Sequence, residues 1–226
     1  MNLYFLVEGR RTEMAVYPAW MKYLLPEYIR VETMEEVVDN HYILMSGFGY
    51  PNLLFHIGNA VADIQRSGKI SYLIICVDSD DQNVKKRENE IFYYMKSQEL
   101  ETNGFVSKVI VQKRCIESWF LGNKSLKKEG KGTIFEEYFS HYDVFHKDPE
   151  EMKKPDDYKG SIGNYHTSYL CALFRIHNMF YSKKHPYAVC REEYLRELVH
   201  RAETSCDLGT LRHFLKLCKK IKEETR

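Results

Sequence analysis

The segment SYLIICVDSDD, at residues 71–81, constrains the fold more than any other part of the chain. It is a continuous run of apolar residues that ends abruptly in acidic ones. A short apolar run without polar alternation is typical of a strand buried on both faces, as in a parallel sheet. The pattern therefore predicts an α/β protein with a group of acidic side chains directly after a buried strand.

Strand and helix patterns alternate through the first part of the chain. Besides the segment above, strands are expected at residues 2–9, 41–49 and 105–114, and helices at 12–26, 52–68 and 81–100. The order β-α-β-α-β-α-β predicts a mostly parallel, Rossmann-like sheet flanked by helices.

The composition changes after this alternating part. We therefore predict an α/β domain at residues 1–122. Residues 123–162 are rich in Lys, Gly, Asp and Pro, which indicates an insertion or connecting region. Residues 163–226 carry apolar side chains at three- and four-residue spacing, which predicts a helical C-terminal region packed on the α/β domain.

Composition excludes several classes of protein. The 33 Lys and Arg residues nearly balance the 32 Asp and Glu residues, so any surface that contacts nucleic acid must be local. The six cysteines show no CxxC spacing, which argues against a zinc ribbon. The sequence contains no secretory leader pattern and no apolar run of membrane-spanning length. We expect a cytoplasmic protein that does not interact with membranes.

Acidic residues stand at the ends of two predicted strands. Glu8 ends the first strand, and Asp78 and Asp80 end the third. Functional residues of open parallel sheets gather at the carboxyl ends of the strands, and residues two apart in a strand project to the same side. We expect these three carboxylates to converge within metal-ligand range. They stay ionised together only around a cation, and hard oxygen ligands favour Mg²⁺ or Mn²⁺.

Each acidic group also has an ordinary structural interpretation. Acidic residues after a strand often serve turns and helix N-caps, and Asp81 could simply cap the following helix. Glu117, directly after the fourth strand, is either a carboxylate at the functional edge or a glutamate favourably placed near a helix start. His166 is either a base or phosphate contact, or a structural histidine.

Two motifs together carry a family resemblance. LVEGRRTE at residues 6–13 and IICVDSDD at residues 74–81 resemble the TOPRIM domain, in particular OLD-type nucleases and small stand-alone TOPRIM-like proteins of bacterial defence loci. The shared features are a glutamate ending the first strand, a glycine after it, and a DxD ending a later strand. The resemblance covers roughly residues 1–120.

The resemblance implies a Mg²⁺-dependent nuclease acting on DNA or RNA, in a phage-defence setting. By position, Glu8, Asp78 and Asp80 would be ligands of a first metal, and Glu13 would serve a second. Glu117 would be a further catalytic acid. Candidates for a basic side chain that stabilises the transition state are Arg10, Arg11, Lys113 and Arg114, whose alternative role is ordinary surface charge. The chain contains no GxxxxGK[ST] stretch, so the ATPase part of full-length OLD proteins is absent.

Two other functions stay open. One is a catalytically inactive TOPRIM-like module that binds nucleic acid or a separate partner protein; under any of these functions the chain could also form a homodimer. The other is a phosphatase with a nucleophilic aspartate in DSDD. Such enzymes usually carry Thr or Val at the position of Gln82 and place the motif on the first strand, which disfavours this interpretation. Lysines in the C-terminal region, such as Lys183 and Lys184, could contact phosphates.

Overall fold

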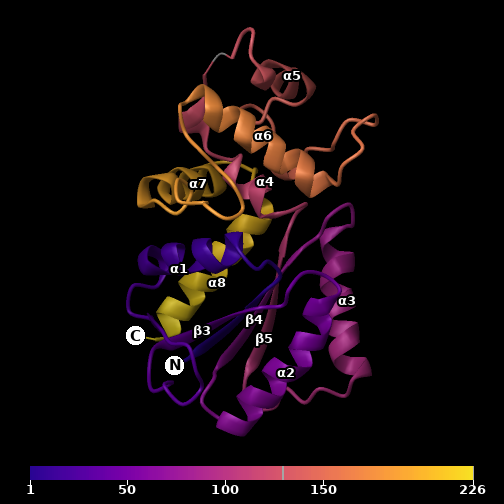
Figure 1. The fold of residues 1–226 in the computed structure, drawn as a ribbon. Helices are drawn as coiled ribbons and strands as arrows, with labels where there is room; N and C mark the ends of the chain where they lie inside the picture. Colours follow the sequence, from indigo (N-terminus) through magenta and orange to yellow (C-terminus); the bar gives the residue numbers. More distant parts are fainter. Residues whose placement is uncertain (129, 226) are drawn as a thin grey trace.

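The computed structural model describes residues 1–128 and 130–225; Glu129, in the predicted insertion, and Arg226 lie outside the described residues. Its centre is a five-stranded sheet in the order β2-β3-β1-β4-β5, and every pairing is parallel (Figure 1). The strands are β1 (Leu3–Val7), β2 (Ile29–Arg30), β3 (His41–Ser46), β4 (Tyr72–Asp78) and β5 (Val106–Gln112). The predicted α/β class is thus confirmed. The sequence did not predict β2, a two-residue edge strand.

The sheet register brings the strand ends together. β1 lies between β3 and β4, and Val7 is paired with both Ser46 and Cys76. All five residues of β1 are buried, as expected for the central strand of a sheet covered on both faces. The residues that follow β1, β3 and β4 therefore emerge at one edge.

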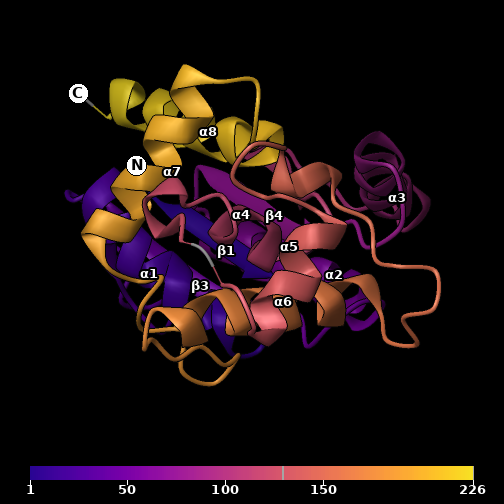
Figure 2. The same cartoon turned by 90° about the horizontal axis from the view of Figure 1, so that it is seen from above.

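Helices cover both faces of the sheet (Figures 1 and 2). Alternate residues of β1 supply two separate cores: Phe5 packs with α1 (Thr12–Leu24) and α8 (Gly209–Glu224), whereas Leu6 packs with α2 (Asn52–Ser67) and α3 (Val84–Ser97). Helix α8, from the C-terminal end of the chain, thus completes one face of the sheet.

The remaining helices lie beyond the carboxyl ends of the strands (Figures 1 and 2). They are α4 (Ile116–Phe120), α5 (Ile134–His141), α6 (Ile162–Ile176) and α7 (Glu192–Thr204), with 3-10 turns at Lys124–Leu126 and Pro149–Glu151. Helix α7 is placed to one side, over α1 and next to α8. One apolar core runs from β1 through these helices to α8, so the C-terminal region packs directly on the α/β part. No helix in the described part of the chain is both long and apolar enough to cross a membrane.

A stack of aromatic rings fixes helix α4 over the sheet. The Trp119 ring lies between Trp20 of α1 and Phe214 of α8, with ring centroids 6.3 and 6.0 Å away and nearly parallel planes. Its indole nitrogen donates a hydrogen bond of 2.8 Å to Oγ1 of Thr210. The short helix that carries Glu117 is therefore held by residues from both ends of the chain.

Candidate functional site

A pocket of about 330 Å³ opens at the carboxyl edge of the sheet. Four carboxylates from four different segments line it: Glu8 after β1, Glu13 in α1, Asp78 at the end of β4, and Glu117 in α4. The other lining residues are Gly9, Arg10, Arg11, Thr12, Phe48, Gly49, Ile116 and Lys183. The pocket therefore combines a concentrated negative charge with three basic side chains at its walls.

Glu8 is held by the backbone of neighbouring segments. Its Oε2 accepts a hydrogen bond of 3.0 Å from the Asp78 amide, and its Oε1 accepts one of 3.3 Å from the Tyr50 amide. Burial raises the pKa of Glu8, and the negative charge of Asp80 adds to the rise, against the lowering effect of the two amides. The Glu8 carboxyl is thus fixed at the end of β4 in surroundings that disfavour its charged form.

Asp78 lies where its ionised form is strongly disfavoured. Burial raises its pKa well above the ordinary value, and the charges of Glu8, Glu13, Glu117 and Asp80 raise it further. Its Oδ1 is buried and has no hydrogen-bond partner among the described residues. A buried carboxylate oxygen without a partner is costly, and this one lies among other carboxylates.

Asp80 stands at the edge of this group and does not line the pocket. Its carboxylate lies 3.7 Å from the guanidinium of Arg87, which is buried and stacked over the Tyr50 ring at 4.0 Å. Burial raises the pKa of Asp80, whereas Arg87 lowers it. The backbone of Asp80 is in the left-handed region, with φ of 50°. The expected convergence of Glu8, Asp78 and Asp80 is therefore only partial, since Asp80 is turned toward Arg87.

The turn after β4 is tied to the end of β5. The Ser79 amide donates to the Gln112 carbonyl over 2.9 Å, and Ser79 Oγ accepts from the Arg114 amide over 2.9 Å. Helix α3 is capped by Asn83, whose Oδ1 accepts from the Lys85 amide over 2.8 Å. Asp81 is therefore not the cap that the structural interpretation of the motif assigned to it.

Glu13 is buried in the first turn of α1 and folds back onto the strand end. Its Oε1 accepts a hydrogen bond of 3.0 Å from the Gly9 amide. A Cβ atom at Gly9 would lie 1.9 Å from Oε2 of Glu13, so this position needs glycine for the carboxylate to approach. Burial raises the pKa of Glu13 to about 7, with further contributions from the charges of Glu117 and Glu8.

Glu117 lies both at a helix start and at the wall of the pocket. It lies in the first turn of α4, and its buried side chain also reaches the pocket. Its Oε1 accepts a hydrogen bond of 2.9 Å from the Tyr181 hydroxyl and lies 3.8 Å from Nζ of Lys183. The carboxylate is therefore positioned by a segment more than sixty residues away along the chain.

Lys183 brings a positive charge to the pocket from the C-terminal region. It lies in a short hairpin closed by the bridge between Ser182 and His185, and its carbonyl accepts from Oγ1 of Thr12 over 3.4 Å. The pKa of Lys183 is raised by the charge of Glu117, with smaller contributions from Asp78 and Glu13. The sequence named Lys183 as a candidate phosphate contact by its charge, and its place at the pocket depends on a tertiary contact with Glu117.

The basic residues proposed from the sequence divide into two groups. Arg10 and Arg11 line the pocket. Lys113 forms an ion pair with Glu151, and the Arg114 guanidinium donates to the Asp80 carbonyl over 3.3 Å. Lys113 and Arg114 therefore interact with protein groups outside the pocket.

His166 is a buried structural residue. Its Nδ1 lies 2.9 Å from Ser118 Oγ and its Nε2 lies 3.2 Å from the Met152 carbonyl. Burial lowers the pKa of His166 to about 4, so the ring is neutral near pH 7. It does not line the acidic pocket.

The carboxylates suit a divalent cation chemically, although they are not arranged around one. Over residues 1–128 and 130–225, no three His, Cys, Asp or Glu side chains are grouped so that they could hold a metal ion. Glu8, Glu13 and Glu117 each direct an oxygen to an amide or hydroxyl of the protein. The unpartnered Asp78 oxygen and the all-carboxylate donor set nonetheless fit Mg²⁺ or Mn²⁺.

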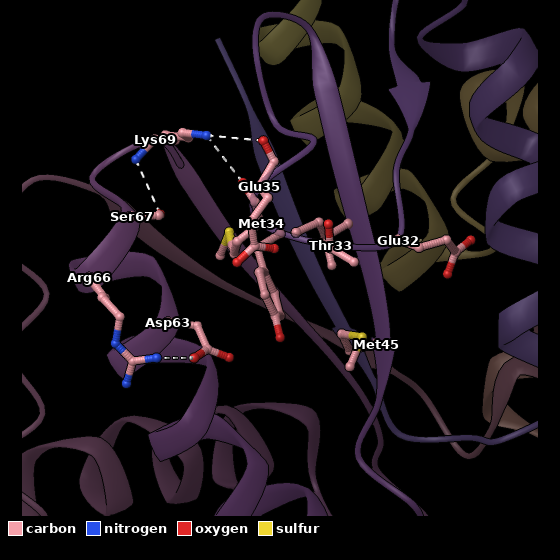
Figure 3. A pocket seen from close by; sticks show the side chains of 11 residues that line it. Glu32, Thr33, Met34, Glu35, Met45, Asp63, Arg66, Ser67 and Lys69 are labelled. Carbon is pink, nitrogen blue, oxygen red and sulfur yellow. Dashed lines mark hydrogen bonds and ion pairs between the residues drawn. The ribbon is translucent and has the colours of Figure 1, made fainter.

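A second hollow, of about 460 Å³, lies beside β3 and the last turns of α2 (Figure 3). Several of its charged residues contact protein groups: Asp63 pairs with Arg66 over 3.7 Å, and Lys69 donates to the carbonyls of Met34 and Glu35 over 3.3 Å. None of the acidic residues that line it is buried, whereas Glu13 and Glu117 of the first pocket are, and the first pocket also holds the unpartnered Asp78 oxygen. The acidic pocket is therefore the better candidate for chemistry.

No protein-family model, curated protein or solved structure matches this chain.

Proposed function

We propose that this chain is a Mg²⁺- or Mn²⁺-dependent nuclease of the TOPRIM type, which hydrolyses phosphodiester bonds of DNA or RNA. One observation carries the proposal: four carboxylates from β1, α1, β4 and α4 line a single pocket whose walls also carry Arg10, Arg11 and Lys183. Clustered carboxylates suit a hard cation, and basic side chains suit a phosphate.

Each pocket residue has a role in this proposal. Glu8 and Asp78 would hold the ion, joined by Asp80 after a side-chain rotation away from Arg87; Glu13 would hold a second ion. The ion would polarise the phosphoryl group and lower the pKa of a coordinated water. Lys183 would neutralise the negative charge that builds up on the phosphate, since its Nζ already lies among acidic groups at the pocket wall.

A catalytically inactive module that binds nucleic acid or a partner protein is the second candidate. One observation favours it: the carboxylates contact protein donors, and within the described residues they form no group ready to hold an ion. Under this alternative the pocket carboxylates would be structural, and their replacement would leave nucleic-acid binding unchanged.

Cleavage assays separate the two candidates. The purified protein is incubated with supercoiled plasmid, single-stranded DNA and RNA, in Mg²⁺, in Mn²⁺ and in EDTA. The proposal predicts metal-dependent cleavage of at least one substrate, lost in Glu8→Ala and retained in Glu193→Gln, which removes an exposed charge on α7. Absence of cleavage in every metal, or equal cleavage by Glu8→Ala, would overturn it.

A further inference from the structure

Phe48 is an aromatic side chain displayed at the wall of the acidic pocket. It follows β3 at the carboxyl edge of the sheet, next to Gly49, and both residues line the pocket. Half of its surface is exposed, at 50%. Its φ of 59° lies in the left-handed region, which is unfavourable for a bulky residue. The fold therefore keeps a large apolar ring in solvent in a backbone conformation that favours smaller residues.

The neighbours of Phe48 extend this surface. The His56 ring lies 5.3 Å away, tilted by 37°, and the exposed Phe55 packs edge-on against the same histidine at 5.8 Å. The guanidinium of Arg10 lies over the Phe48 ring at 5.2 Å. An aromatic surface with a positive charge thus adjoins the carboxylates.

Packing does not account for this arrangement. Phe48 belongs to neither of the two apolar cores, and its exposed ring gains little from burial. Tyr93, by contrast, is 74% exposed on α3 and lies outside the pocket. A ring beside a cationic group, at the rim of a site that suits phosphates, matches how proteins bind unpaired bases.

We propose that Phe48 stacks against an unpaired base of a single-stranded nucleic acid, and so selects single strands as the substrate of this pocket. The inference rests on the proposed function, because it assumes that a phosphodiester enters the acidic pocket. Arg10 and Arg11 carry the charge that the adjacent phosphates need, and Arg10 adds a cation–π contact.

A preference for single-stranded over duplex substrate follows from how an aromatic ring contacts a base. In a duplex both faces of each base are covered by its neighbours, whereas an unpaired base can stack on an exposed side chain. Phenylalanine offers no hydrogen bond to a base edge, so it distinguishes strandedness without reading sequence. The preference is therefore expected to hold across different sequences.

The test is an abasic scan measured by fluorescence anisotropy in EDTA, where no cleavage occurs. A labelled twelve-nucleotide single strand is compared with versions that lack one base at each position in turn, and with the matching duplex. Four proteins are measured: wild type, Phe48→Ala, Phe48→Trp, and Tyr93→Ala as the control for an exposed aromatic outside the pocket.

The proposal predicts that wild type binds the single strand more tightly than the duplex. Loss of one particular base should weaken wild-type binding about tenfold, the usual effect of one stacked base. Phe48→Ala should weaken binding of the intact strand by the same factor and make that position insensitive to base removal. Phe48→Trp should restore the sensitivity, and Tyr93→Ala should behave as wild type.

Two results would overturn the inference: a Phe48→Ala protein that binds every strand as wild type does, or a wild type that prefers the duplex. The cleavage assay is independent of this outcome. If the protein cleaves nucleic acid and Phe48→Ala binds as wild type does, the nuclease proposal stands and the stacking proposal is wrong. If Phe48→Ala weakens binding but the wild type cleaves no substrate, the stacking proposal stands and the nuclease proposal is wrong.

Discussion

The backbone amide of Asp78 donates a hydrogen bond of 3.0 Å to Oε2 of Glu8, and this contact joins the ends of β1 and β4. It places the acid of the first motif beside the acid of the second across seventy residues of sequence. Because β1 and β4 pair in parallel register, their carboxyl ends meet at one edge, and the two motifs share one pocket.

Replacement of Lys183 is expected to impair cleavage more than substrate binding. Its ammonium lies 3.8 Å from Glu117 at the pocket wall, where it would oppose charge that develops on the phosphate. For Lys183→Ala we predict a fall in kcat of about 10²- to 10³-fold, typical of the loss of one transition-state donor, with a smaller change in KM. Lys184→Ala, at the exposed neighbouring position, is the matched control. Equal rates for the two variants would contradict the role of Lys183.

Gly9→Ala is expected to damage the site while leaving the fold intact. The added methyl group would occupy the place of the Glu13 carboxylate, which would have to leave the Gly9 amide. We predict at least a tenfold loss of cleavage, with a far-ultraviolet circular dichroism spectrum identical to that of wild type. Gly58→Ala on α2, where a Cβ meets no atom within 4 Å, is the control and should cleave normally.

Stability should depend on the ionisation of Glu13. Its folded-state pKa of about 7 lies above the ordinary value of 4.5, so the folded protein binds this proton more tightly than the unfolded chain. The resulting stability is complete below pH 4.5 and is lost as the pH rises through 7. In EDTA at pH 8, Glu13→Gln should therefore be more stable than wild type, by on the order of 2 kcal/mol.

The measurement is urea unfolding of both proteins at pH 5 and pH 8. The comparison with Glu13→Gln is needed because His166 acts in the opposite direction: its lowered pKa, about 4, makes stability fall as the pH drops below 6.5. His166 is present in both proteins, so its contribution cancels in the difference. A wild type that is more stable than Glu13→Gln at pH 8 without metal would contradict the electrostatic account.

Phe48→Asn should increase stability and decrease binding of single strands. Asparagine tolerates the left-handed backbone better than phenylalanine, so we expect a gain of about 1 kcal/mol in the free energy of unfolding. Loss of the ring should weaken binding of a single strand about tenfold. Phe55→Asn, at an ordinary helical position on α2, should give no such gain. A lower stability of Phe48→Asn would show that the Phe48 ring stabilises the fold by packing, which would contradict its assignment as a binding residue.

The sheet was predictable because its signals are local. Buried parallel strands appear as continuous apolar runs, and the segment before Asp78 is the clearest of them. The edge strand β2 gave no signal, because two residues are too few for a pattern and only Ile29 and Arg30 form it. The placement of Glu8 and Asp78 at one edge followed from the strand ends, whereas for Glu117 the sequence left the role of a helix-start residue equally open.

The remainder of the pocket depends on tertiary contacts that no local pattern encodes. Lys183 and Tyr181 reach Glu117 from a hairpin of the C-terminal region, and their sequence neighbourhood resembles ordinary surface loop. Asp80 was expected to join Asp78 by strand geometry, but the chain leaves the extended conformation there, with φ of 50°, and Arg87 attracts its carboxylate. The backbone turn and one ion pair thus override the strand periodicity.

Metal titration by isothermal calorimetry shows whether the acidic pocket binds a divalent cation through Asp78. Wild type, Asp78→Asn and the control Glu193→Gln are titrated with Mn²⁺ and Mg²⁺ at pH 7.5 in two buffers of different ionisation enthalpy. We predict saturable binding to wild type and to Glu193→Gln with release of protons, because the raised pKa values of Asp78 and Glu13 must be overcome, and at least tenfold weaker binding to Asp78→Asn. Absence of binding to wild type, or equal binding to Asp78→Asn, would contradict the assignment of this pocket as a metal site.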